Sequence, residues 1–347
     1  MAATRRVGLV LGTAADAAFG DPRRNHPVAW FGRLAAAAER VCYAGHRWAG
    51  VCYTGVLVGA MAGVGLFLER ITRRRPVVHS IVTALVTWMV LGARSLAEQG
   101  TAMARALHAG QLGTARTLLP NLCGRDPQCL DLSGLARASV ESVAENTSDA
   151  VVAPLLWGAL AGIPGLLSYR AINTLDAMVG YHSPRYQHFG WAAARLDDLV
   201  NLLPSRTAAG LAVLCAPLVG GSPSNAWRCW QADAAAHPSP NAGQVEAAFA
   251  GALGVQLGGT TAYSHGVELR PVLGHGRLPT AADLHRAVAL SRVITVTAAG
   301  LGAALATAAQ RAGRSTTAAT GGSRGRPAAT SYGSPSRRPA VASRQAK

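Results

Sequence analysis

The chain has almost no lysine: of its 33 basic residues 32 are arginines, and the single lysine is Lys347. A nucleotide-binding P-loop needs a lysine after its glycines, and Schiff-base catalysis needs a lysine amine. The residues before Lys347 can therefore support neither. Any phosphate bound there must be held by arginine side chains, backbone amides or a metal ion.

Charged residues are also scarce, at 14% of the chain, whereas soluble domains carry roughly 25%; hydrophobic residues make up 50% and the mean hydropathy is +0.20. A helix needs about 20 mainly apolar residues to cross a bilayer. Five stretches without Asp, Glu, Lys or Arg are close to that length, namely residues 51–68, 76–93, 150–169, 207–227 and 293–310. We predict an all-α, multi-pass protein of the cell membrane. Because much of this apolarity is Ala and Gly, buried helices of a soluble protein are the alternative.

The two ends of the chain and one late segment need separate interpretations. Residues 1–20 resemble a signal peptide, but Asp16 interrupts their apolar run, so an uncleaved, short first membrane helix is expected. Residues 247–264 lack formal charge, yet their "GGTT" favours a buried helix and loop. We predict one domain, 1–309, and a disordered basic tail, 310–347, whose eight basic residues could touch anionic lipid.

Two further classes of site are not expected. No basic strip is interleaved with aromatic residues, the pattern typical of single-stranded nucleic-acid binding, so no nucleic-acid partner is predicted. The six cysteines form no C-x-x-C pair and are interpreted as reduced thiols.

Acidic residues are concentrated in the middle of the chain, with eight of the seventeen between Asp126 and Asp198. On a helix over residues 134–149, Glu141, Glu145 and Asp149 would form one stripe. This stripe leads into the apolar stretch 150–169, where a carboxylate is costly unless it is paired or bound to a cation. A solvated helix face and a site for a divalent metal or phosphate are both consistent with the pattern.

Two further motifs combine acids with amides. In "NTLDAMVGY", Asn173 and Asp176 lie three residues apart, which offers the hard oxygen ligands that suit Mg²⁺. In "ARLDDLVNLLPSR", Asp197 and Asn201 lie one helical turn apart. A polar helix packed on a neighbour is the alternative for the first motif, and a cap or ion pair is the alternative for the second.

Two proline-rich loops complete the pattern. "GDPRRNHPVAWFG" contains His26, and "HPSPNAGQVEAAFAGALGVQLGG" contains His237 and Asn241. Prolines next to Asn, His and Gly are typical of a fixed turn. A structural role is more common than a catalytic one for a histidine before proline.

Taken in order, these motifs resemble the CobD/CbiB family of cobalamin biosynthesis, the adenosylcobinamide-phosphate synthases. The matching stretches are "GDP…HPV", "RDP…LD", "VESVAENTSDAVVAPL", "NTLDAMVGY…RY…FG", "ARLDDLVN…P.R" and "HPSPNAG…AAFAGALGVQLGG", and they extend from Gly20 to Gly276. The sequence departs from the family pattern at Ala177, where the family usually has Ser, and at His182, where the family usually has Lys. The second departure removes a charge near the phosphate-binding candidates.

The resemblance implies an integral-membrane ligase that joins the free propionate carboxyl of adenosylcobyric acid, a corrinoid, to aminopropanol or its O-phosphate. It implies ATP as co-substrate and Mg²⁺, with membrane lipid and possible corrinoid-pathway enzymes as partners. The expected metal ligands are Glu145, Asp149, Asp176 and Asp198; the first three, with His26 as proton acceptor, are the expected catalytic residues. The expected phosphate- and substrate-binding residues are Asn146, Asn173, Arg170, Arg185, Arg195, Asp198, Arg206 and Asn241.

Alternatives remain for both function and topology. A Mg²⁺-dependent membrane prenyltransferase would need N-D-x-x-D motifs, and "NTLDAM" lacks the last acid; a multi-pass transporter would carry its acids inside the spans. If 150–169 crosses the membrane, "ENTSD" and "NTLD" lie on opposite faces and cannot share one ATP. Its prolines and glycines also fit a broken or re-entrant segment buried in protein.

Overall fold

The computed structural model describes residues 2–21, 26–181, 183–263 and 266–321, and these are mainly helical. The helices are α1 (Ala2–Phe19), α2 (Pro27–Cys42), α3 (Arg47–Thr72), α4 (Pro76–Val90), α5 (Ala93–His108), α6 (Leu112–Leu118), α7 (Leu132–Thr147), α8 (Ala153–Leu175), α9 (Tyr186–Phe189), α10 (Trp191–Cys215), α11 (Pro223–Asp233), α12 (Ala242–Leu253) and α13 (Ala281–Gly321). Two π-helical segments, Ser148–Val152 and Asp176–Gly180, follow α7 and α8, and two strands, β1 (Leu257–Tyr263) and β2 (Gly266–Leu273), pair antiparallel. The chain divides into two units, Met1–Gln310 and Arg311–Lys347.

The prediction of a multi-pass membrane protein is confirmed at the level of helix length and composition. Within the described residues, five helical segments are long and apolar enough to cross a bilayer: Arg47–Thr72, Pro76–His108, Leu132–Gly180, Trp191–Val219 and Ala281–Ala308. Each overlaps one of the five charge-free stretches. Helix α1, expected as a short membrane helix, is helical but is not among these five.

Local sequence signals set several helix starts. Pro27, Pro76 and Pro223 occupy the first turns of α2, α4 and α11, where a missing backbone N–H costs nothing. Asp131 caps α7, since its Oδ1 accepts the backbone N–H of Gly134 at 2.7 Å. The helix that carries the "ENTSD" motif therefore begins at a defined residue.

Helix α8 does not cross the membrane as one rod, because it breaks at Gly162. That residue has φ 71° and ψ −147°, a backbone conformation that residues other than glycine rarely adopt. In a continuous helix Asp149 and Tyr169 would lie about 30 Å apart. Instead the Tyr169 hydroxyl lies 3.1 Å from the Asp149 carbonyl oxygen. Residues 150–169 thus form a re-entrant hairpin, so both of its ends lie on one side.

An ion pair caps both broken helix ends at the hairpin tip. Arg5 Nη1 donates to the carbonyls of Ala159 and Leu160, which end the first arm, at 3.2 and 3.3 Å. Glu69 Oε2 accepts the N–H of Ile163, which begins the second arm, at 3.1 Å. Arg5 and Glu69 pair with each other at 2.9 Å. Each charge opposes the helix dipole at the end it contacts, so the break is satisfied without water.

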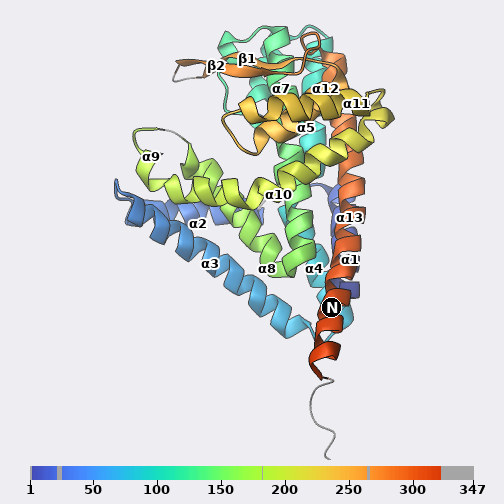
Figure 1. The fold of residues 1–347 in the computed structure, drawn as a ribbon. Helices are drawn as coiled ribbons and strands as arrows, with labels where there is room; N and C mark the ends of the chain where they lie inside the picture. The colour runs from blue at the N-terminus through green and yellow to red at the C-terminus, as the bar shows by residue number, and fades with distance from the viewer. Residues whose placement is uncertain (1, 22–25, 182, 264–265, 322–347) are drawn as a thin grey trace, which may run out of the picture. The chain divides into compact units, whose positions relative to one another are not determined.

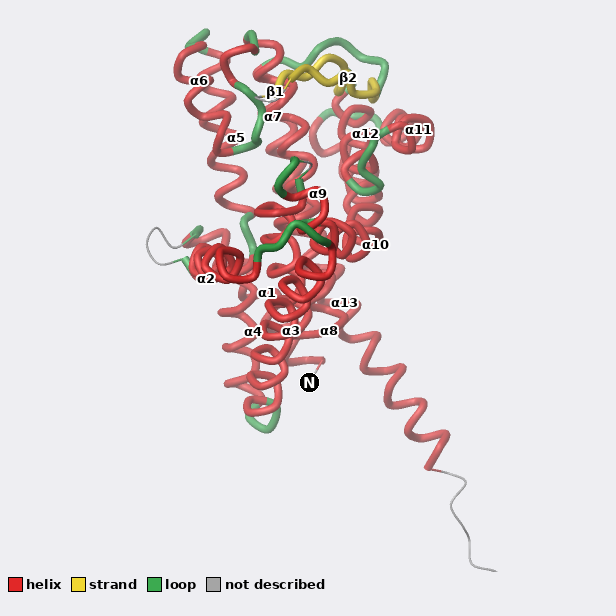
Figure 2. The backbone as a smooth tube through the Cα atoms, turned by 90° about the vertical axis from the view of Figure 1, so that its left-hand side faces the viewer, coloured by secondary structure: helices red, strands yellow, loops and turns green. Residues whose placement is uncertain are grey.

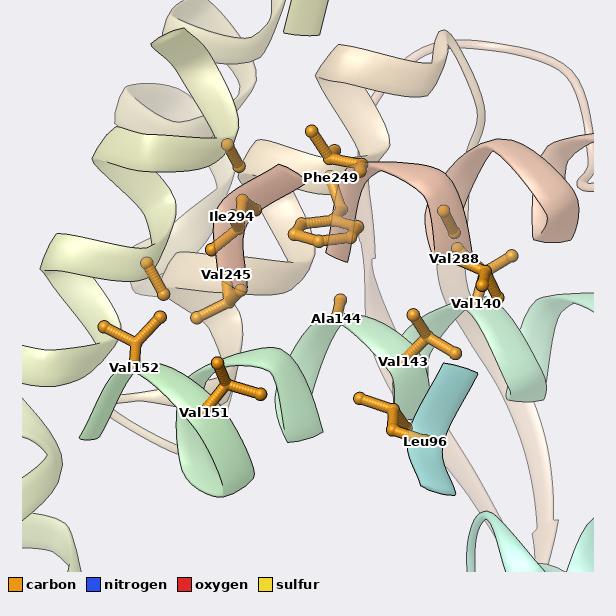
Figure 3. Close-up of a cluster of buried hydrophobic side chains, with 14 of the residues drawn as sticks. Leu96, Val140, Val143, Ala144, Val151, Val152, Val245, Phe249, Val288 and Ile294 are labelled. Atoms are coloured by element: carbon orange, nitrogen blue, oxygen red, sulfur yellow. The ribbon is translucent and has the colours of Figure 1, made fainter. Parts of the chain in front are cut away.

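The first unit has two distinct ends. Helices α5, α7, α11 and α12 and the β1–β2 hairpin gather at one end, and the α3–α4 junction lies at the other (Figures 1 and 2). Next to the β1–β2 hairpin, α5, α7, α12 and α13 contribute to one apolar core, in which Val143, Phe249 and Val288 are buried (Figure 3). This core fixes the rotation of α7, so its opposite side is left for polar residues.

One segment differs from the sequence-based expectation. The stretch 247–264 was expected to be a helix and loop, but its second half forms strand β1, because Gly258 and Gly259 adopt positive φ and let the strand bulge against β2. Helix α13 extends to Gly321, and the boundary between the two units, after Gln310, lies next to the predicted end of the domain at residue 309. Residues 322–347 of the predicted tail, and His182, lie outside the described residues.

The capped hairpin predicts a large effect of a single substitution at its tip. Glu69→Ala leaves the Arg5 charge and the Ile163 N–H without their acceptor, and should destabilise the fold by roughly 2 kcal/mol or more. Thermal unfolding of the protein in lipid nanodiscs measures this loss. The control is Glu98→Gln, which breaks an exposed pair with Arg94 and should cost no more than about 1 kcal/mol. Equal melting of both variants would contradict the capping role.

Candidate active site

The re-entrant hairpin brings the first two acidic motifs together. Asp149 lies in the π-helical segment before α8 and Asp176 in the one after it, and π-helical turns frequently occur at functional sites. Asp149 interacts electrostatically with Asp176, Asp197, Glu145 and Arg170. Motifs far apart in the sequence therefore converge on one acidic cluster, which we define as Glu145, Asp149, Asp176 and Asp197. Glu145 is the exposed member of the cluster, and the other three are half-buried.

A hydrogen-bond network holds this acidic cluster in place. Asn201 Nδ2 donates to Asp197 Oδ2 at 2.9 Å, which leaves Asn201 Oδ1 as an acceptor. The Tyr169 hydroxyl donates to that Oδ1 at 2.9 Å, and it also lies within hydrogen-bonding distance of the Asp149 carbonyl. Asn173 lies close to the Asp197 carboxylate. Tyr169 and Asn201 are buried, so the network is rigid.

A polar cavity of about 200 Å³ adjoins the acidic cluster, with Arg170 between the two. Asp21, Ser95, Gln99, Asn121, Asn146 and Arg170 provide its polar lining. The Ser95 hydroxyl donates to Asp21 Oδ2 at 2.6 Å. A larger cavity of about 720 Å³ lies against the other face of α5, between α1 and α13.

His26 lies beside Asp21, with its Nε2 3.9 Å from Asp21 Oδ1. Its Nδ1 accepts the backbone N–H of Val28 and so caps α2, which places the proton of a neutral ring on Nε2. Burial lowers the pKa of His26 more than Asp21 raises it, so the ring is neutral at pH 7. The geometry therefore favours His26 as a donor toward Asp21; proton acceptance by His26 stays a prediction.

Three predicted arginines do not join the acidic cluster. Arg185 pairs with Glu39 at 2.9 Å and stacks over Tyr43, Arg195 is exposed and pairs with Asp198, and Arg206 is exposed and donates to Leu202 of its own helix. Both polar groups of the Asn241 side chain are occupied: its Nδ2 donates to the Asp198 carbonyl and its Oδ1 accepts from Ser205. Of the predicted arginines, only Arg170 reaches the acidic cluster.

Two arginines that were not predicted lie on the far side of Glu145. Glu145 interacts electrostatically with Arg125 and Arg270. Arg125 also pairs with Glu141, whose Oε1 accepts the Gly258 N–H at 2.7 Å. Arg125 and Arg270 come from a loop and from β2, so no single motif of the sequence unites them with Glu145.

A second buried pair lies in the same part of the fold. His237 Nε2 is 3.9 Å from Glu246 Oε2, and both residues are buried. Burial raises the pKa of Glu246 and lowers the pKa of His237. Both shifts favour the neutral forms, so this pair contributes little charge to the acidic cluster.

The sequence analysis missed several residues of this region as site residues, and one of them had a visible signal. Asp198 was chosen as a ligand; it pairs with Arg195 at 3.5 Å and also interacts electrostatically with Asp176. The neighbouring Asp197, which was not chosen, interacts with both Asp149 and Asp176. The one-turn spacing of Asp197 and Asn201 indicated this. Asp21, the pair Ser95 and Gln99 of α5, and Asn121 come from three separate parts of the chain and gave no common pattern.

The acidic cluster is not a preformed metal cage. Within the described residues, no three His, Cys, Asp or Glu side chains converge closely enough to hold a metal ion. Mg²⁺ does not require such a cage, because it usually keeps several waters and binds one or two carboxylates together with substrate phosphates. The carboxylates of the acidic cluster are donors of this type.

The sequence was compared with known proteins. A family model described as "CobD/Cbib protein" matches residues 9–291. "Cobalamin biosynthesis protein CobD" of Mycobacterium tuberculosis (strain ATCC 25618 / H37Rv) is 56% identical over 298 residues, covering 86% of this chain and 95% of the relative. Proteins of the same name from Geobacter metallireducens and Chromobacterium violaceum are 45% and 44% identical, covering 78% and 79% of this chain and 87% and 88% of the relatives. No solved structure matches the chain.

The hydrogen-bond network predicts the effect of removing one hydroxyl. Tyr169→Phe leaves Asn201 Oδ1 buried without its donor, which should cost about 1–3 kcal/mol. Tyr43→Phe is the matched control, because its hydroxyl donates to the Arg185 carbonyl in an exposed position. Thermal unfolding in nanodiscs should therefore show a larger loss for Tyr169→Phe, and the reverse order would refute the network.

Proposed function

Because the chain belongs to the CobD/Cbib family of cobalamin biosynthesis proteins, we propose that it is an ATP-dependent ligase. It joins aminopropanol, or aminopropanol O-phosphate, to the free propionate carboxyl of adenosylcobyric acid and yields adenosylcobinamide or its phosphate. One observation carries this proposal: residues 150–169 turn back as a re-entrant hairpin, so that Asp149, Asp176 and Asp197 lie together beside a polar cavity. Membership of this family argues against the two alternative functions, a membrane prenyltransferase and a transporter.

The chemistry requires activation of the carboxyl group. A carboxylate does not condense with an amine at neutral pH, because its oxygen is a poor leaving group. Transfer of the γ-phosphoryl group of ATP forms an O–P bond to the carboxylate and releases ADP. The amine nitrogen then attacks the acyl carbon, the C–O bond breaks, phosphate leaves and the nitrogen loses a proton. The protein's main task is to position three substrates and to balance their charge.

Side chains near the acidic cluster can share this task. Arg170 lies between the cluster and the polar cavity, and Arg270 interacts with Glu145, so both are suited to phosphate oxygens in a chain without a lysine there. Asp149 and Asp197, with Asp176 near them, would hold Mg²⁺. The ion would neutralise charge on the nucleotide phosphates.

The proposal predicts product and its dependence on one carboxylate. Protein in nanodiscs, supplied with adenosylcobyric acid, ATP, Mg²⁺ and either amine, should form the amide, detected by mass spectrometry, and EDTA should abolish it until Mg²⁺ is restored. Asp197→Asn should lower kcat roughly 100-fold, whereas Asp198→Asn should lower it less than about tenfold. No product with either amine would refute the ligase, and a larger effect of Asp198→Asn would refute the assignment of Asp197.

A further inference from the structure

The polar cavity beside the acidic cluster has the size of a small ligand. Its volume of about 200 Å³ is below the roughly 300–1,000 Å³ of pockets for drug-sized molecules. A corrinoid and ATP are both too large for it. The cavity is therefore suited to the smallest of the three proposed substrates.

The two charged groups of the cavity have opposite sign and come from different elements. Asp21 Oδ2 is occupied by the Ser95 hydroxyl, but its Oδ1 is buried and has no hydrogen-bond partner within the described part of the chain, because His26 Nε2, at 3.9 Å, is beyond hydrogen-bonding distance. Arg170 Nε is likewise buried without a partner there. The two side chains interact electrostatically. Such a pair can bind a ligand that carries a positive group at one end and a negative group at the other.

Resting on the proposed function, we propose that this cavity is the subsite for the amine substrate. The Asp21 carboxylate accepts from the ammonium group, and the Arg170 guanidinium donates to the phosphate of aminopropanol O-phosphate. Gln99, Asn121 and Asn146 offer amide groups to the remaining oxygen atoms. Arg170 also interacts with Asp149, so a ligand held here lies next to the acidic cluster.

The subsite also predicts which amine is preferred. Unphosphorylated aminopropanol would leave Arg170 without a phosphate, whereas inorganic phosphate would leave Asp21 without an ammonium. Only the phosphorylated amine satisfies both ends. We therefore expect aminopropanol O-phosphate to bind at least about tenfold more tightly than either fragment, because a charged hydrogen bond contributes about that factor or more.

The experiment measures binding and turnover separately, with the full-length protein in nanodiscs. Binding of aminopropanol O-phosphate, aminopropanol and inorganic phosphate is followed by the shift in Tm, and KM is measured for each amine, ATP and adenosylcobyric acid. Asp21→Asn should weaken binding of both amines at least about tenfold, and Arg170→Gln should weaken only the phosphorylated one. Ser95→Ala should raise the KM for the amine about threefold and leave the KM for ATP unchanged.

Matched controls come from the same helix as Ser95. Glu98→Gln and Arg105→Gln change exposed charges on α5 that do not line the cavity, and both should bind the amines as the wild type does. Comparison of Tm without ligand identifies any variant that fails to fold. If Asp21→Asn or Arg170→Gln fails to fold, the milder variant Ser95→Ala tests the subsite in its place.

The outcomes distinguish this inference from the proposed function. Product formation with unchanged amine binding in Asp21→Asn and Arg170→Gln would overturn the subsite and leave the ligase intact. Amine binding that depends on Asp21 without product would support the subsite and refute the ligase. Absence of amine binding in the wild type would overturn the subsite.

Discussion

The whole site depends on the break in α8 at Gly162. A helix that enters a membrane must satisfy every backbone group without water, so it normally continues to the other side. Here the Arg5–Glu69 pair supplies the missing partners at both broken ends, which permits the chain to turn back inside the membrane segment. Asp149 and Asp176 consequently lie on one side of the protein. A substrate could then reach both from one compartment.

The acidic cluster poses an energetic problem that its surroundings reduce. Several carboxylates close together repel one another, and burial makes each of them more costly. Asn201 donates a hydrogen bond to Asp197, and Tyr169 in turn donates to Asn201. Glu145 keeps solvent access, and Arg170, Arg125 and Arg270 supply positive charge around the cluster. What remains is a group of carboxylates suited to a cation, flanked by arginines suited to anions.

Much of the fold could be predicted from sequence because lipid imposes a simple rule on it. All five charge-free stretches lie at least partly within helices long enough to span, since a bilayer tolerates few exposed charges. The strand β1 could not be predicted in this way: its "GGTT" is a local pattern compatible with a loop, and only its pairing with β2 makes it a strand. Within the site, the motif acids were predicted correctly as neighbours, but Arg185, Arg195 and Arg206 were grouped with them because they are near in sequence, and their side chains find partners elsewhere.

The sequence alone determined the class of protein, its helical membrane segments, the motifs of its family and, through the absence of lysine before residue 347, the exclusion of a lysine-based site there. The tertiary structure decided that "ENTSD" and "NTLD" share a side, that Asp197 interacts with the acids of both motifs, and that Asp21 and Ser95 line a cavity with Arg170. The physical reason is that composition and periodicity act within one segment, where lipid and the backbone set the rules. The meeting of side chains depends on the path of the chain between segments, and here a single glycine conformation and one ion pair set that path.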